Sequence, residues 1–142
     1  MPDFPSGTFT EKEAREIEKE SDNIEKRIKV YKKASERMLK NLQKAVSGRA
    51  FQAVPEALST WSMLITESLK DIQANLEPKN KRPKPLIKFE IQVRKAIRDI
   101  RNLKIRAPVD QQDVFDRCIG QAEDVHSKMV DILFNPGGDT DK

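Results

Sequence analysis

From Phe51 to Leu76 the chain reads FQAVPEALSTWSMLITESLKDIQANL. The large apolar residues of this stretch are three or four positions apart throughout: Phe51, Val54, Leu58, Trp61, Ile65, Leu69, Ile72 and Leu76. Because an α-helix turns once in about 3.6 residues, this spacing places them on one face of a helix. Proline lacks an N–H and is tolerated in the first turn of a helix. We therefore expect a short helical turn that leads into a main helix from Pro55.

A second apolar series runs through the N-terminal third of the chain. Its members recur every seven positions, or lie four positions after such a residue: Ile17, Ile24, Ile28, Tyr31, Met38, Leu42 and Ala45. Thr10 and Glu13 have the spacing of a capping box, and Ser47-Gly48 is the first strong stop signal after them. We therefore expect one continuous helix over 11–46, which at ~1.5 Å per residue would be roughly 54 Å long. Such a helix would project beyond its shorter partners.

Helical spacing continues in the C-terminal half of the chain, after an exposed basic loop at 79–85 that is rich in proline and lysine. Residues 87–93 alternate as a strand would, but the sequence beyond them has helical spacing. The sequence thus predicts an all-α fold, a single-domain antiparallel bundle of four helices with a long first helix. The bundle is expected over 10–134, with helices at 11–46, 50–76, 86–106 and 110–134, an N-terminal arm at 1–9 and a flexible C-terminal tail at 135–142.

The composition is that of one highly charged domain. The chain has 142 residues, and 35% of them are charged, against ~25% in an average protein. Cys118 is its only cysteine, so an intrachain disulfide cannot form. No apolar run approaches the ~18 residues of a membrane span, and the N-terminal residues lack the pattern of a secretion signal. We therefore expect a cytoplasmic protein without a membrane span.

Positive charge is concentrated in the loop and helix expected over 79–106. This segment has 11 basic and 2 acidic residues, whereas residues 107–142 have 3 basic and 8 acidic ones. The helix expected over 11–46 adds a row of basic residues at spacings of three or four, opposite its apolar face. Like charges at these spacings destabilise a helix slightly, so helix stability alone does not explain the row.

The basic rows are therefore the candidate functional surface. We predict a non-enzymatic protein that acts through protein–protein association with an acidic partner, or through self-association as a homo-oligomer. Docking would then also involve the isoleucines near these rows: Ile17, Ile24, Ile87 and Ile91. The alternative is nonspecific binding of nucleic acid or another polyanion, and a third interpretation is a solvated face without a partner. The candidate residues are Lys33, Arg37, Lys40, Lys44, Lys81, Arg82, Lys84, Arg94, Arg98 and Arg101.

Two features of the sequence refine these hypotheses. Tyr31 and Phe89 are the aromatic residues of the basic segments, and both lie on apolar faces, so bases would find no stacking platform. Binding of a polyanion would then be mostly electrostatic. The acidic residues of the last helix could dock the basic rows of another copy, or could shield them within one chain.

No motif for catalysis or metal binding is complete. Glu123 and His126 have the Glu-x-x-His spacing of di-metal bundle proteins, but such sites need two motifs and the chain has one histidine. Cys118 and His126 would be roughly 12 Å apart along one helix, which is too far for a nucleophile and its base. Nucleotide-binding and serine-hydrolase motifs are absent from the sequence. We therefore predict no enzymatic activity, cofactor, metal or small-molecule substrate.

Overall fold

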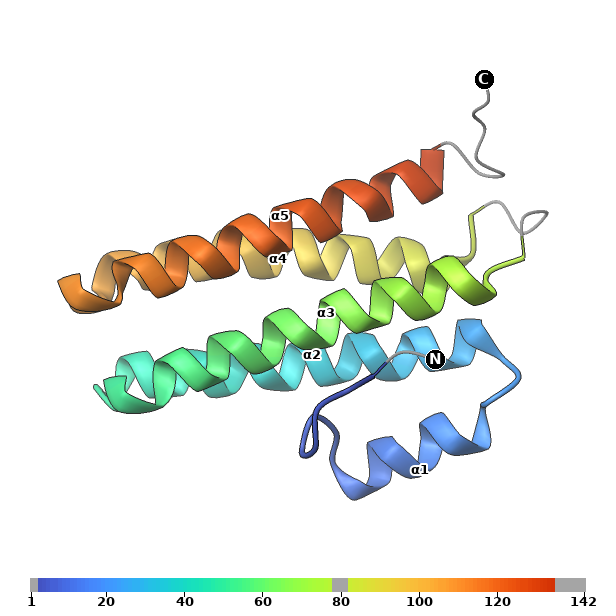
Figure 1. Ribbon diagram of the computed structural model, residues 1–142, viewed down its shortest axis with the longest axis horizontal. Coiled ribbons are helices and arrows are strands. Elements are labelled where there is room, and N and C mark those ends of the chain that lie inside the picture. Colours follow the sequence, from blue (N-terminus) through green and yellow to red (C-terminus); the bar gives the residue numbers. More distant parts are fainter. Residues whose placement is uncertain (1–2, 78–81, 135–142) are drawn as a thin grey trace.

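The computed structural model describes residues 3–77 and 82–134, a part of the chain that contains helices and no strand (Figure 1). The all-α fold is confirmed, with one helix more than predicted in this part of the chain. The elements are α1 (Glu11–Lys19), α2 (Ile24–Ser47), the 3₁₀ turn η1 (Phe51–Ala53), α3 (Val54–Asn75), α4 (Lys84–Arg106), the 3₁₀ turn η2 (Val109–Gln111) and α5 (Gln112–Phe134).

The four long helices form a bundle in which α2 and α5 each pack against both α3 and α4. Consecutive long helices run in opposite directions (Figure 1). As a result α2 lies beside α4, and the two helices run in the same direction, although α3 separates them in the sequence. The N-terminal ends of α2 and α4 therefore meet at one end of the bundle.

The core lies along the axis of this bundle and is made from the apolar faces that the helical spacing predicts. Its largest fully buried side chains include Trp61, Tyr31, Phe89 and Phe115. The indole N–H of Trp61 donates a hydrogen bond of 2.8 Å to the hydroxyl of Ser35, which is itself buried. The core therefore satisfies the polar atom of its largest side chain.

The single long helix predicted over 11–46 is wrong, because the chain turns back between Lys19 and Ile24. Figure 1 shows α1 folded alongside α2 instead of extending it. Asn23 caps α2, since its side-chain oxygen accepts a hydrogen bond from the backbone N–H of Lys26. Arg27 donates to the carbonyl oxygens of Glu20 and Ser21 at 2.9 and 2.7 Å, and a continuous helix would have used these acceptors itself.

The turn between α1 and α2 is anchored to α3 through the same arginine. The Arg27 guanidinium donates to both carboxylate oxygens of Asp71, each at 2.9 Å, and the hydroxyl of Tyr31 donates to Asp71 at 2.5 Å. Burial by itself raises the pKa of Asp71, but the hydrogen bonds from Arg27, Tyr31 and Asn75 outweigh it and hold the pKa below its usual range. The buried pair thus keeps its charges and fixes the turn.

The N-terminal arm and α1 are also attached to the bundle. Phe4 and Phe9 pack on Tyr31, with ring centroids 5.5 and 6.1 Å from it. Ile17 is half-buried against the core, so the apolar projection expected for the first helix is absent.

The other expected helices agree with the structure to within a few residues. Pro55 lies in the first turn of α3, after η1, as the sequence indicates. Residues 87–93 are helical despite their alternation. The capping box of Thr10 and Glu13 is present at the start of α1. Asp110, the first residue of the last expected helix, lies within η2, directly before α5.

Candidate anion-binding groove

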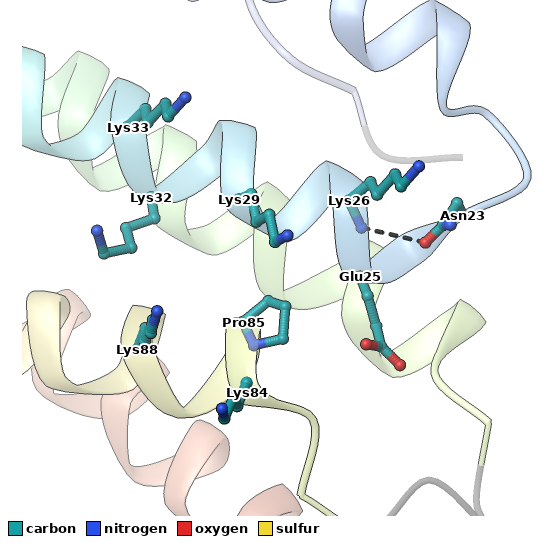
Figure 2. A pocket seen from close by; sticks show the side chains of 9 residues that line it. All are labelled: Asn23, Glu25, Lys26, Lys29, Lys32, Lys33, Lys84, Pro85 and Lys88. Carbon is teal, nitrogen blue, oxygen red and sulfur yellow. Dashed lines mark hydrogen bonds between the residues drawn. The ribbon is translucent and has the colours of Figure 1, made fainter.

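A groove of about 490 Å³ lies between α2 and α4 at the end of the bundle where both helices begin (Figure 2). The N-terminal turns of α2 and of α4 form its walls. Six of its nine lining residues are lysines: Lys26, Lys29, Lys32, Lys33, Lys84 and Lys88. The other three are Asn23, Glu25 and Pro85. We call this feature the lysine groove.

Three of the six lysines extend between the two walls of the groove, whereas the amino group of Lys84 points away from α2 (Figure 2). Lys29 and Lys32 extend from α2 toward α4, and the amino group of Lys88 extends from α4 toward α2 (Figure 2). Lys26 and Lys33 point away from α4 at the outer edge. Spacings of three and four residues stack the α2 lysines on adjacent turns, so their charges gather at one place.

Most of this charge is not neutralised within the described part of the chain. Lys32 pairs with Glu36, with 3.2 Å between Nζ and Oε2, while the other five lysines form no ion pair with a described residue. One carboxylate, that of Glu25, lines the groove with the six ammonium groups. The groove is therefore strongly positive.

The N-terminal end of α4 adds to the positive potential. The N-terminus of a helix carries a partial positive charge, and acidic residues or side-chain caps usually compensate it. In α4 the capping residue is Pro83, which gives no side-chain hydrogen bond, and the first turn contains no acidic residue. Lys84 occupies that turn instead, so two positive charges lie close together without local compensation.

Basic residues in the C-terminal half of α4 behave differently. Arg101 pairs with Glu123 of α5, and Lys104 pairs with Asp116 of α5 at 2.5 Å. Arg94 lies 3.3 Å from Glu90 on its own helix. Two basic residues of this half of α4 are therefore paired with α5 within one chain, whereas the exposed Lys95 and Arg98 form no ion pair with a described residue.

The structure divides the candidate residues of the sequence analysis. Lys33 and Lys84 line the groove. Lys40, Lys44 and Arg98 are exposed outside it, whereas Lys81 is outside the described residues.

Two other candidates serve the fold. Arg37 binds both carboxylate oxygens of Glu13 and the carbonyl of Thr8, which holds the arm and α1 against α2. Burial raises the pKa of Glu13, but the contacts with Arg37 and Thr10 together outweigh it, so the pKa lies below its usual range. Arg82 donates to the carbonyl of Leu133 and lies over the ring of Phe134, so it connects the start of α4 to the end of α5.

Four groove lysines were outside the candidate set. Lys26 and Lys29 belong to the basic row of the first helix, and Lys88 lies one turn after Lys84. Lys32 lies beside Lys33 in the sequence. The spacing of these lysines along each helix can be read from the sequence. The sequence does not show that α2 and α4 lie side by side, so it does not show that these lysines share one groove.

Cys118, Glu123 and His126, the side chains considered for catalysis or metal binding, are buried or bound to other residues of the chain. Burial raises the pKa of the Cys118 thiol to about 12, so the nucleophilic thiolate is not formed near neutral pH. His126 Nε2 lies 2.6 Å from Glu90 Oε2, whereas Glu123 pairs with Arg101. Within residues 3–77 and 82–134 no three His, Cys, Asp or Glu side chains are close enough to hold a metal ion.

The fold and the groove together define a helical bundle with a basic cleft between two parallel helices. No protein-family model matches the chain, and no curated protein or solved structure matches it. Among the helices in the described ranges, none has both the length and the apolar character needed to cross a membrane.

Proposed function

We propose that this protein is a non-enzymatic binding protein that recognises a phosphate-rich polyanion through the lysine groove. The observation that carries the proposal is a groove lined by six lysines from two helices, five of them without an ion pair to a described residue. Three of the six, Lys29, Lys32 and Lys88, extend between the two walls. Phosphate groups attract such clusters because each neutralised phosphate also releases its counterions.

The placement of the lysines supports a binding role over a merely solvated face. Lysines at successive turns repel one another, and a lysine in the first turn of α4 is unfavourable next to the helix dipole. Elsewhere on α4, Arg101 and Lys104 have acidic partners on α5. An anionic ligand would remove this repulsion in the groove.

We expect the protein to bind a labelled DNA duplex, used as a general polyanion, with strong salt dependence. With a log–log slope of about −0.9 per phosphate, three contacts would lower the affinity about 40-fold between ~50 and ~200 mM salt. Fluorescence anisotropy measures both affinities. Absence of binding of both the duplex and inorganic tripolyphosphate at the lower salt concentration would contradict the proposal.

Two double variants of equal net charge locate the binding surface. Lys29→Glu with Lys88→Glu reverses one exposed charge on each wall of the groove. Arg117→Glu with Lys128→Glu reverses two exposed charges on α5, which lies diagonally opposite α2 in the bundle. The groove variant should bind at least about 10-fold more weakly than the α5 variant. Equal loss in both would show only an effect of net charge.

A second candidate function is self-association between α4 of one copy and the acidic face of α5 of another. Ile91 and Ile105 of α4 are 48% and 82% exposed and lie on one side of the helix among basic residues. Light scattering of the wild-type chain at about 100 µM would then give the mass of a dimer. Ile91→Ser with Ile105→Ser would give a monomer, whereas a monomeric wild type would exclude this candidate.

A further inference from the structure

We propose that the occupant of the lysine groove is a compact group that bears several phosphates, bound by ammonium groups from both walls. This inference rests on the proposed function and names its ligand class. The same chemistry occurs in short inorganic polyphosphate and in the multiply phosphorylated headgroup of an inositol lipid. Four properties of the groove lead to this class.

The first property is size. Lys26 and Lys33 mark the ends of the lysine series on α2, and seven residues of helix cover roughly 10 Å. The cavity volume of about 490 Å³ is within the range of small-molecule sites, ~300–1,000 Å³. A rigid duplex lying across so short a groove would place few of its phosphates between the walls. A ligand with adjacent phosphates would place all of them there.

The second property is the enclosure of charge from two sides. Lys29 and Lys32 extend from one wall and Lys88 extends from the other (Figure 2). A ligand between them would contact ammonium groups on opposite sides at once. Its negative charge must therefore be concentrated within the ligand, as it is when phosphates are adjacent, and not spread along an extended chain.

The third property is the absence of aromatic side chains from the lining. The lining residues include no aromatic side chain, and Pro85 is their only apolar residue. Tyr31 and Phe89, the aromatic side chains of α2 and α4, are buried in the core. A nucleobase would find no ring to stack on. Recognition would therefore depend on charge.

The fourth property is the type of cation. All six basic lining residues are lysines, whereas Arg27, Arg37 and Arg101 of the same two helices bind partners within the chain. Guanidinium groups suit planar, bidentate contacts with one carboxylate or phosphate. Ammonium groups on flexible side chains are point charges that can move to meet several tetrahedral phosphates. The side-chain oxygen of Asn23 is already bound to the Lys26 N–H, so its amide NH₂ remains as a neutral donor.

Isothermal titration calorimetry of the full chain with inorganic tripolyphosphate tests the inference. At about 50 mM salt and without divalent ions, we expect one site per chain and at least ~10-fold tighter binding than for orthophosphate. The Lys29→Glu, Lys88→Glu variant should bind tripolyphosphate about 30-fold more weakly, and the Arg117→Glu, Lys128→Glu variant should stay within about 2-fold of wild type. Circular dichroism would confirm that both variants are folded.

Three results would overturn the inference. They are equal affinity for tripolyphosphate and orthophosphate, unchanged tripolyphosphate binding in the groove variant, and equally tight binding of a glutamate hexapeptide. Duplex binding without tripolyphosphate binding would reject the compact ligand and leave the proposed function standing. If neither the duplex nor tripolyphosphate bound, the compact ligand and the proposed function would both be rejected.

Vesicles separate the two sources of the ligand. We would compare vesicles that contain phosphatidylinositol bisphosphate with phosphatidylserine vesicles of equal charge. Preference for the inositol lipid, lost in the groove variant, would assign a lipid headgroup. Equal, weak binding to both vesicles, together with tight tripolyphosphate binding, would assign a soluble polyphosphate.

Discussion

Asp71→Ala is expected to lower the free energy of unfolding by about 3–5 kcal/mol, the usual effect of removing one partner from a buried ion pair. The Asp71 side chain is 4% exposed and accepts hydrogen bonds from Arg27 and Tyr31. Without this carboxylate, the variant would bury a guanidinium that has lost its counter-charge and a hydroxyl that has lost its acceptor. Both losses act on the folded state.

Urea unfolding followed by circular dichroism measures this effect. Asp124→Ala is the matched control, because Asp124 forms an exposed ion pair with Lys128 one turn away on α5. Such surface pairs contribute ~0–1 kcal/mol, so the control should unfold almost as the wild type does. Asp71→Asn tests the charge separately, since it retains the shape and a hydrogen-bond acceptor. Equal stability of Asp71→Ala and Asp124→Ala would contradict the assignment of Asp71 as the anchor.

The same network predicts how stability changes with pH. The pKa of Asp71 is held below its usual range in the folded protein, so the unfolded chain takes up a proton first as the pH falls. Stability from this group is therefore complete above the usual carboxyl pKa and is lost as the pH falls through the lowered value. The Asp71→Ala variant should lack this part of the acid sensitivity. Urea unfolding between neutral and acidic pH measures the difference.

Trp61→Ala should also lower the free energy of unfolding, by about 3–5 kcal/mol. Trp61 of α3 is 1% exposed and packs in the core of the bundle. Its removal would leave a large cavity and would leave the Ser35 hydroxyl without its donor. Unfolding has to be followed by circular dichroism, because the chain has no other tryptophan.

Three variants distinguish the contributions of volume and hydrogen bonding at Trp61. Trp61→Phe fills most of the space without the N–H, and Ser35→Ala leaves the buried N–H unpaired, an effect of about 1–3 kcal/mol. Met63→Ala, on the same helix but 38% exposed, should change stability by less than ~1 kcal/mol. Similar decreases in the free energy of unfolding for Trp61→Ala and Met63→Ala would contradict the role of Trp61 in stabilising the core.

Helical spacing predicted the long helices well because it is a local property. The residues from Phe51 to Leu76 repeat every three or four positions, and all of the stretch except its ends is helical. The same criterion failed at residues 20–23, where the seven-residue spacing of apolar residues passes through the turn. Ser21, Asp22 and Asn23 favour helix caps, and this signal could have shown the break.

The candidate site was predicted less completely than the helices. Lys33 and Lys84 were identified from charge alone, while Lys32 and Lys88 were not, although they line the same groove. Arg37 had the same spacing as the groove lysines but binds Glu13 in the folded chain. Spacing along one helix shows which residues share a face, but it does not show which other helix lies beside that face.

The sequence by itself determined the all-α class, the approximate ends of the long helices and the concentration of basic residues, because each depends on residues close together in the chain. The tertiary structure decided the rest. The turn between α1 and α2 depends on the contact of Arg27 with Asp71, two residues that are 44 positions apart. The lysine groove depends on α2 and α4 lying side by side in parallel, an arrangement set by burial of all four long helices together.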